Sequence, residues 1–381
     1  MNLRAKLDAI QAEKKSAPAS SVPEVRFTDC WKRRALRPLT EVEGAFGLDR
    51  ENVALMTEAE LPQPLDPARI LYLDTETTGL GGGSGTVAFE VGLGFLTEEG
   101  FEVRQLVMRD YPEEVFLLRE VEKHLRRFDV VCTFNGSTFD LPLLRTRFLM
   151  NRMRPDCLDM PHIDLLHIAR RVFKLRLGRC NLTRLEEVIL GQTRTDDLPG
   201  SQVPQRYFDY LKTGNFDLLT DVLRHNEQDI ASLCVLLTRM AEWYGRPQGL
   251  RHAEDVLSMG VALERAKHTE QAKQCYRLVP AGRYHALGQQ RLALRLRRDG
   301  RGEEAASVWK EMIARNEGGA HPYTELAKYY EHILRDPERA LDMTREALIR
   351  FSGSSLGGSG DGTEALLKRY DRLRRKVDGK K

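Results

Sequence analysis

Cysteine is sparse in this sequence, and long apolar runs are missing from it. The six cysteines among 381 residues are scattered singly and form no Cys-x-x-Cys pair. This spacing argues against a zinc site and fits reduced thiols in a cytosol. No uninterrupted apolar run approaches the ~20 residues of a membrane-spanning helix, and the N-terminus is charged rather than apolar. We therefore expect a cytoplasmic protein with no membrane partner.

The glycine-rich segment 79–85 lacks the residues that would make it a phosphate-binding loop. No Gly-Lys-Ser/Thr follows the glycines, so the P-loop pattern fails. The segment instead predicts a flexible turn between two strands.

Charge is unevenly distributed along the chain. The net charge is only +3, yet residues 1–40 contain nine Lys/Arg against four Asp/Glu, and residues 363–381 contain eight against three. Basic ends can reach toward phosphate backbones, and they can equally serve solubility alone. The hydrophobic and charged fractions, 41% and 30%, are those of ordinary globular proteins, and the length predicts two or three domains.

The apolar and glycine pattern predicts an α/β domain over residues 67–245. β-Prone runs predict strands at 69–75, 86–96, 101–109 and 129–134, and the short connection at 97–100 makes the second and third antiparallel. Helical periodicity at 112–127 places a crossover before the fourth strand, so we expect a mixed sheet flanked by helices. Further helices are predicted at 138–151, 162–190, 204–213 and 216–243.

The residues before this domain carry weaker signals. We interpret residues 1–66 as a basic, partly disordered extension, with a short helix at 2–15, a linker at 16–23 and an irregular remainder that packs on the main domain. The remainder includes the basic cluster Lys32–Arg34.

The pattern after residue 250 changes to helices alone. Three helix pairs start near Ala253, Tyr284 and Pro322, a spacing in the mid-thirties that is typical of tetratricopeptide-type repeats. Each pair carries an alanine at a similar offset in its second helix: Ala272, Ala305 and Ala340. We predict an all-α repeat domain over 250–352 that docks a protein partner. A Gly/Ser linker and a basic helix follow at 353–381.

Asp74 and Glu76 end the first predicted strand. Residues i and i+2 of a strand point to the same side, so the two carboxylates share one face where the chain leaves the sheet. Paired carboxylates repel each other, and a divalent cation such as Mg²⁺ relieves that repulsion. The alternative is a strand that simply ends in a polar turn.

Two later segments carry similar groups. Asp140 follows the fourth strand at the start of a helix, where a carboxylate can also serve as a cap. His225 and Asp229 lie one turn apart on a long helix, where they can also form a surface pair.

Together, the Asp74-x-Glu76 strand, the Asn-x-x-x-Phe-Asp140 segment and the helix with Asp229 resemble the DEDD exonuclease superfamily, which has an RNase H-like fold. The resemblance covers residues 67–243. It implies that Asp74, Glu76, Asp140 and Asp229 bind two Mg²⁺ or Mn²⁺ ions. The chain is similar to a bacterial group of RNase H-like domains that are often fused to tetratricopeptide repeats.

His225 departs from the superfamily pattern. The superfamily's general base is a histidine five residues, or a tyrosine four residues, before the last aspartate, whereas His225 is a histidine four residues before Asp229. We expect His225 to orient or deprotonate the attacking water. The alternative is that His225 lies on the helix surface, or that it contacts the metal-binding carboxylates without acting as a base.

The resemblance implies a 3′→5′ exonuclease that cleaves single-stranded ends of DNA or RNA. Two alternatives remain: a nucleic-acid-binding scaffold that acts through its repeats, and a structure-specific endonuclease with the same carboxylates. Basic side chains would contact phosphates, and Phe139 would stack a terminal base or pack in the core. The candidate phosphate contacts are Arg145, Arg147, Arg170, Arg171, Lys174, Arg176 and Arg179.

Overall fold

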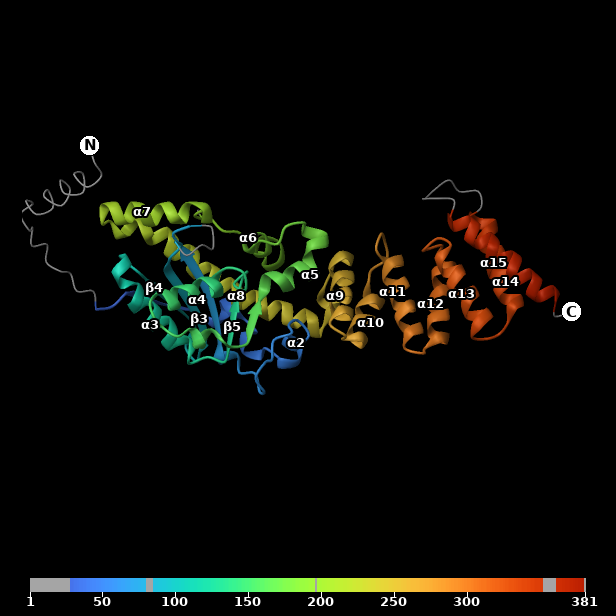
Figure 1. Cartoon of the computed structure of the whole chain (residues 1–381), viewed down its shortest axis with the longest axis horizontal. Coiled ribbons are helices and arrows are strands. Elements are labelled where there is room, and N and C mark those ends of the chain that lie inside the picture. Colours follow the sequence, from blue (N-terminus) through green and yellow to red (C-terminus); the bar gives the residue numbers. More distant parts are fainter. Residues whose placement is uncertain (1–27, 80–84, 196, 352–360, 380–381) are drawn as a thin grey trace, which may run out of the picture.

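The chain is elongated, with a sheet domain at one end and a row of helices that runs to the C-terminus (Figure 1). The computed structural model describes residues 28–79, 85–195, 197–351 and 361–379. The predicted helix at 2–15 and the linker at 16–23 lie outside these residues, as do most of the glycine-rich turn and most of the Gly/Ser linker.

The sheet has six strands in the order β1-β4-β3-β2-β5-β6. The neighbours from β1 to β2 are antiparallel, whereas β5 and β6 run parallel to β2. The predicted mixed α/β sheet is therefore confirmed. The strands are β1 (Trp31–Arg37), β2 (Ile70–Thr77), β3 (Ala88–Thr97), β4 (Gly100–Val107), β5 (Val130–Thr133) and β6 (His162–Asp164).

Two strands lie where the sequence predicted something else. The segment with Lys32–Arg34 is not irregular, because β1 pairs with β4 along the edge of the sheet. Its arginines are satisfied across the strands: Arg34 donates to Glu102 at 2.9 Å and Arg33 donates to Gln105 at 2.6 Å. β6 replaces the predicted start of a helix because its three residues pair with β5 before the chain turns.

Helices cover both faces of the sheet. Leu71 and Leu73 pack with α3, α4 and α7 on one face, whereas Ile70 and Tyr72 pack with α5 and α8 on the other. This alternation follows from the two-residue period of β2. The helices are α2 (Arg50–Ala54), α3 (Glu114–Leu125), α4 (Asp140–Met150), α5 (Leu165–Leu177), α6 (Leu182–Leu185), α7 (Val203–Thr213) and α8 (Thr220–Gly245).

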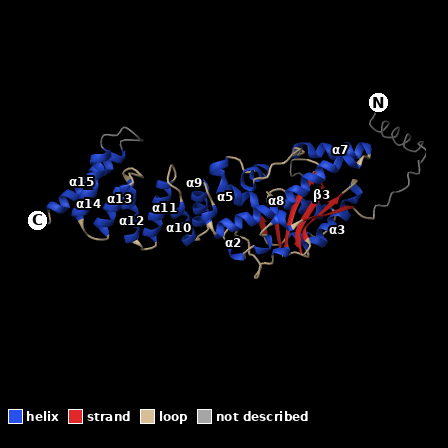
Figure 2. Cartoon of the chain, turned by 180° about the vertical axis from the view of Figure 1, so that it is seen from behind, coloured by secondary structure: helices blue, strands red, loops and turns tan. Residues whose placement is uncertain are grey.

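The long helix α8 lies directly on the strands (Figure 2). Two glycines of β3 make this approach possible. A Cβ at Gly92 would lie 2.1 Å from Oδ1 of Asn226, and a Cβ at Gly94 would lie 2.3 Å from Cγ2 of Ile230. Any side chain at these positions would displace the helix, so the glycines fix how close α8 and its polar residues come to β2.

Three helix hairpins follow, and α9 packs on α5 of the sheet domain. Their second helices carry the predicted alanines, all fully buried, where a small residue allows close packing. No helix among the described residues is long and apolar enough to span a bilayer. The helices are α9 (Ala253–Arg265), α10 (Thr269–Leu278), α11 (His285–Arg298), α12 (Gly302–Ala314), α13 (His321–His332), α14 (Pro337–Phe351) and α15 (Asp361–Asp378).

Candidate active site

Asp74 and Glu76 lie at the end of β2 with partly buried side chains, on the face that α8 covers. Thr75 points to the opposite face, where its Oγ1 donates a 2.5 Å hydrogen bond to Oδ1 of Asp140. Asp140 is the first residue of α4 and is only 3% exposed. Asp140 therefore approaches β2 through Thr75 rather than from the side of α8.

The helix α8 brings His225 and Asp229 to the same strand end. Nε2 of His225 lies 3.6 Å from Oδ2 of Asp229 and 4.0 Å from Oε1 of Glu76. The helical spacing of four residues puts both side chains on one face, and both are about 15% exposed. Glu76, His225 and Asp229 thus gather in one place.

The carboxyl groups of the cluster destabilise one another. Burial, followed by repulsion from Asp229 and Asp140, raises the pKa of Asp74 well above its ordinary value. Burial and the neighbouring acids do the same for the pKa of Glu76. Burial raises the pKa of Asp140 to about 6. These shifts mark a site in which negative charge is under-compensated by the protein itself.

The donor chemistry of this cluster fits a hard divalent cation, since all four acids offer carboxylate oxygens. Within the described residues, no three His, Cys, Asp or Glu side chains are already arranged around one ion position. Protein groups hold three of the acids instead. Asn226 donates to Asp74 at 3.0 Å, Thr75 to Asp140, and Arg194 to Asp229.

A buried polar chain behind Asp74 was missed by the sequence prediction. Asn226 is fully buried, and its Oδ1 accepts a 3.3 Å hydrogen bond from Nε2 of Gln105. The same Gln105 nitrogen donates to Glu90 at 2.8 Å, and Glu90 pairs with Glu76 across the two strands. Burial raises the pKa of Glu90 to about 8, so this carboxyl is mostly protonated at neutral pH. Polar residues inside otherwise apolar strands were the available signal.

Asp197 and Arg194 form a second set of missed residues, on the segment before α7. Nδ1 of His225 lies 2.8 Å from Oδ1 of Asp197, so Asp197 fixes which nitrogen carries the proton. Burial raises the pKa of the Asp197 carboxyl, but the bonds from His225 and Arg194 outweigh burial and leave it below its ordinary value. The sequence near Arg194 gives no sign of its contacts with His225 and Asp229, which lie more than 30 residues further along the chain.

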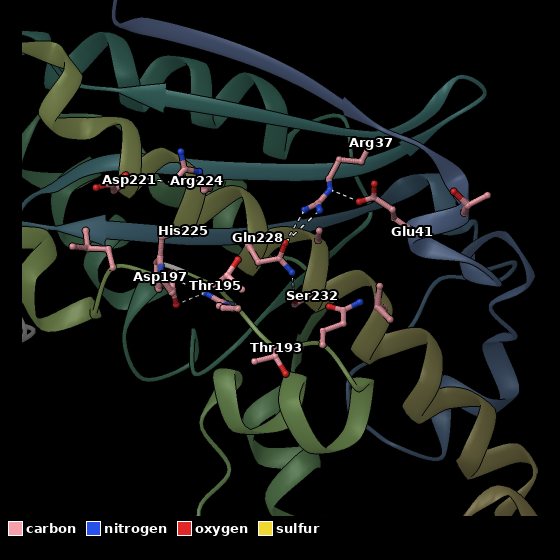
Figure 3. Close-up of a pocket in the computed structure, with 16 residues that line it drawn as sticks. Arg37, Glu41, Thr193, Thr195, Asp197, Asp221, Arg224, His225, Gln228 and Ser232 are labelled. Atoms are coloured by element: carbon pink, nitrogen blue, oxygen red, sulfur yellow. Dashed lines mark hydrogen bonds and ion pairs between the residues drawn. The ribbon is translucent and has the colours of Figure 1, made fainter.

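A pocket of about 590 Å³ opens beside this pair (Figure 3). Arg37 of β1, the segment with Thr193 and one face of α8 line it. His225 and Asp197 lie together along its wall, whereas Arg37 points in from the other side and is tied to Gln228 and Glu41. His225 therefore stands between the pocket and the acidic cluster.

Some of the side chains that were predicted to contact phosphates are accessible, whereas others are buried in ion pairs. Arg147 is a correction, because it is only 8% exposed and makes two hydrogen bonds, of 2.5 and 2.7 Å, to Glu114. Arg176 is another, because its guanidinium is mostly buried against Asp255 of α9 at 2.7 Å. Both arginines hold elements together and do not face solvent.

The remaining candidates stay accessible. Arg145 pairs with Asp159 at 2.5 Å, and Phe139 is half-buried beside Asp140. Arg171 donates to the carbonyl of Met56 at 3.3 Å. The exposed basic side chains on and after α5 are Arg170, Arg171, Lys174 and Arg179.

Comparisons with known proteins agree with this architecture. A model described as the RNase_H superfamily matches residues 71–241. The "Uncharacterized protein YprB" of Bacillus subtilis (strain 168) is 32% identical over 364 residues, which cover 91% of this chain and 86% of that protein. A family B DNA polymerase from the archaeon Pyrobaculum calidifontis aligns with a TM-score of 0.37 and 15% identity over 54% of this chain and 30% of its own, too distant to carry an argument. The chain therefore belongs to the family of YprB and contains an RNase H superfamily domain over residues 71–241.

Proposed function

We propose that the chain is a divalent-metal-dependent nuclease that removes nucleotides from the 3′ ends of single-stranded DNA or RNA. The observation that carries this proposal is the meeting of Glu76, Asp229 and His225 at the end of β2, next to Asp74. Buried carboxylates that repel one another are costly for a fold, and a bound dication offsets that cost.

Each residue has a role in this proposal. Asp74, Glu76, Asp140 and Asp229 hold two Mg²⁺ or Mn²⁺ ions, which when bound supply positive charge to the scissile phosphate and acidify water. His225 accepts the proton of the attacking water at Nε2. The 2.8 Å contact between its Nδ1 and Asp197 supports this role, because it leaves Nε2 facing the acids.

The substrate strand is proposed to reach the site along α5. Arg170, Lys174 and Arg179 are exposed on or just after that helix and would contact phosphates without reading sequence. Affinity should then fall as salt concentration rises.

A scaffold is the second candidate function, and the helix hairpins favour it. We propose that they are a tetratricopeptide-type module at 250–352 that docks a protein. A pocket of about 450 Å³ between α5, α9 and α11 supports this reading, since the exposed Leu175 and Leu287 line it together with Arg171 and Arg265. A scaffold would bind nucleic acid or protein without turnover.

The deciding experiment incubates the full-length protein with end-labelled single-stranded DNA and RNA in Mn²⁺, Mg²⁺ or EDTA. Asp74→Ala and Asp229→Ala test the site. Asp221→Ala is the matched control, since this acid lies on the same helix but is half exposed and paired with Arg224 at 3.5 Å. We expect a metal-dependent ladder from the 3′ end that both site variants abolish and the control keeps.

Other outcomes separate the alternatives. Cleavage of circular single-stranded DNA, which has no ends, would identify an endonuclease. Retained gel-shift binding with no cleavage of either polymer would contradict the catalytic proposal and favour the scaffold.

A further inference from the structure

The guanidinium of Arg194 contacts several groups of the candidate site at once. Its side chain is only 8% exposed. Its guanidinium donates twice to Glu186, at 2.6 Å each, and once to Oδ1 of Asp229. It also lies 3.2 Å from Asp197 and 3.3 Å from Nδ1 of His225. One side chain thus connects the last metal-ligand candidate, the proposed base and the partner of that base.

Glu186 anchors Arg194, whose guanidinium also reaches the cluster through Asp229. Glu186 is fully buried, so it requires a cation, and the two-point fork of Arg194 supplies one with fixed geometry. Ser232 donates to the same carboxylate. The pair is therefore held in a fixed geometry, and the guanidinium that Glu186 anchors also balances part of the charge of Asp229.

At Asp229, Arg194 contacts one carboxylate oxygen and His225 faces the other. Arg194 takes Oδ1, whereas Oδ2 faces Nε2 of His225 at 3.6 Å, on the side where Glu76 lies. Carboxylates that bind metal are commonly hydrogen-bonded from behind in this way, and removal of such a partner costs about 10–100-fold in metal affinity.

We propose that Arg194 is a positioning residue that fixes Asp229 and His225, so that Oδ2 of Asp229 is presented to the metal ion. The inference rests on the proposed function. The same contacts allow one alternative. In it, the guanidinium of Arg194 occupies the position of a metal ion and must be displaced before that ion can bind. The two readings predict opposite changes in metal affinity.

The test measures Mn²⁺ binding to the full-length protein by titration calorimetry and by the electron paramagnetic resonance signal of free Mn²⁺. Arg194→Met removes the fork, and Arg194→Lys keeps the charge without it. Arg184→Met is the matched control, because Arg184 is half exposed and pairs with Glu187 at 2.7 Å. We expect Mn²⁺ binding to weaken by about 10–100-fold in Arg194→Met, by less in Arg194→Lys, and not at all in the control.

Steady-state kinetics add a second readout. With a labelled oligonucleotide, Arg194→Met should lower kcat and leave KM nearly unchanged, since its guanidinium is mostly buried and is held by Glu186, Asp229 and Asp197. If Arg194→Met does not fold by circular dichroism, Glu186→Gln replaces it. This variant removes the anchor of the fork and should weaken Mn²⁺ binding a few-fold.

The outcomes distinguish failure of the inference from failure of the proposed function. Unchanged Mn²⁺ affinity in the folded Arg194 or Glu186 variants would overturn the positioning role while the nuclease proposal stands. Tighter binding would overturn it in favour of a competing cation. A wild-type protein that binds no Mn²⁺ would overturn both.

Discussion

Two equally buried acids, one in the sheet domain and one among the helix hairpins, have pKa values that are shifted in opposite directions. Asp140 and Glu331 are each 3% exposed. Burial raises the pKa of Asp140 to about 6, and hydrogen bonds from the Thr75 hydroxyl and from the backbone N–H groups of Asp140 and Thr75 offset only part of that shift. The pKa of Glu331 is instead lowered to about 2, chiefly by the guanidinium of Arg372.

The pKa values of the two acids differ because their neighbours differ, since both acids are equally buried. Two hydrogen bonds of 2.5 and 2.6 Å from Arg372, and one of 3.3 Å from Lys376, fasten α15 to Glu331 of α13. Around Asp140, the compensating groups are the hydroxyl of Thr75 and two backbone N–H groups, and Asp164 is a nearby acid. Glu331 thus serves stability, whereas the uncompensated charge of Asp140 fits the proposed metal site, where a ligand would complete it.

The largest effect expected from this contrast is that of Asp140→Asn. Asparagine keeps an oxygen for Thr75 but removes the charge. We expect nuclease activity in Mn²⁺ to fall about 10²–10⁴-fold, which corresponds to the several kcal/mol that a positioned metal ion supplies. The measurement is the initial rate on an end-labelled oligonucleotide.

The same variant should be more stable than the wild type without metal. The folded pKa of Asp140 lies above its ordinary value of 3.8, so the wild type loses stability as pH rises through about 6. Asparagine avoids that loss, and we expect about 1–3 kcal/mol more free energy of unfolding in urea at pH 8 with EDTA. If Asp140→Asn is less stable than the wild type in the absence of metal, the contrast drawn between Asp140 and Glu331 is wrong.

Much of the fold could be predicted because its signals are local. The apolar runs of β2, β3 and β4 and the periodicity of α8 and of the hairpins can all be read from short windows. β1 could not, since Lys32–Arg34 becomes a strand only by pairing with β4, some 70 residues later in the chain. β6 is too short for any periodicity to mark it.

The residues of the candidate site also divide into those that could be predicted from the sequence and those that could not. Asp74 and Glu76 share one face of a strand by their spacing, whereas the resemblance to the DEDD exonucleases implied that Asp229 lies beside them. Arg194 and Asp197 could not, because they lie on an irregular segment and gain meaning only from contacts to α8 and Glu186. Arg147 was misjudged as a surface arginine, since nothing in its own segment reveals Glu114.

The second effect is the loss of stability in Glu331→Gln. The glutamine cannot hold Arg372 as an ion pair, and α15 should loosen from α13. Arg372 and Lys376 are about half exposed, so water partly solvates them once they are released. We therefore expect a loss of about 1–3 kcal/mol in urea unfolding, with nuclease activity unchanged.

Glu338→Gln is the matched control for this change, because Glu338 is an exposed acid on the adjacent α14. Its free energy of unfolding should stay within about 0.5 kcal/mol of the wild type. Equal losses in both variants would mean that the contact with α15 contributes nothing specific.

The smallest effect is a difference in pH dependence between the two acids. The folded pKa of Glu331 lies below its ordinary value of 4.5, so its contribution is complete above pH 4.5 and is lost as pH falls toward about 2. The stability deficit of Glu331→Gln should therefore be constant from pH 7 to 5 and shrink below that. The gain of Asp140→Asn should have the opposite sign and vanish earlier, between about pH 6 and 3.8. Urea unfolding in EDTA from pH 8 to pH 3, followed by circular dichroism, measures both. The two differences disappear over pH ranges that overlap only between about pH 3.8 and 4.5. A deficit of Glu331→Gln that persists unchanged at pH 3 would show that packing, and not charge, holds α15 in place.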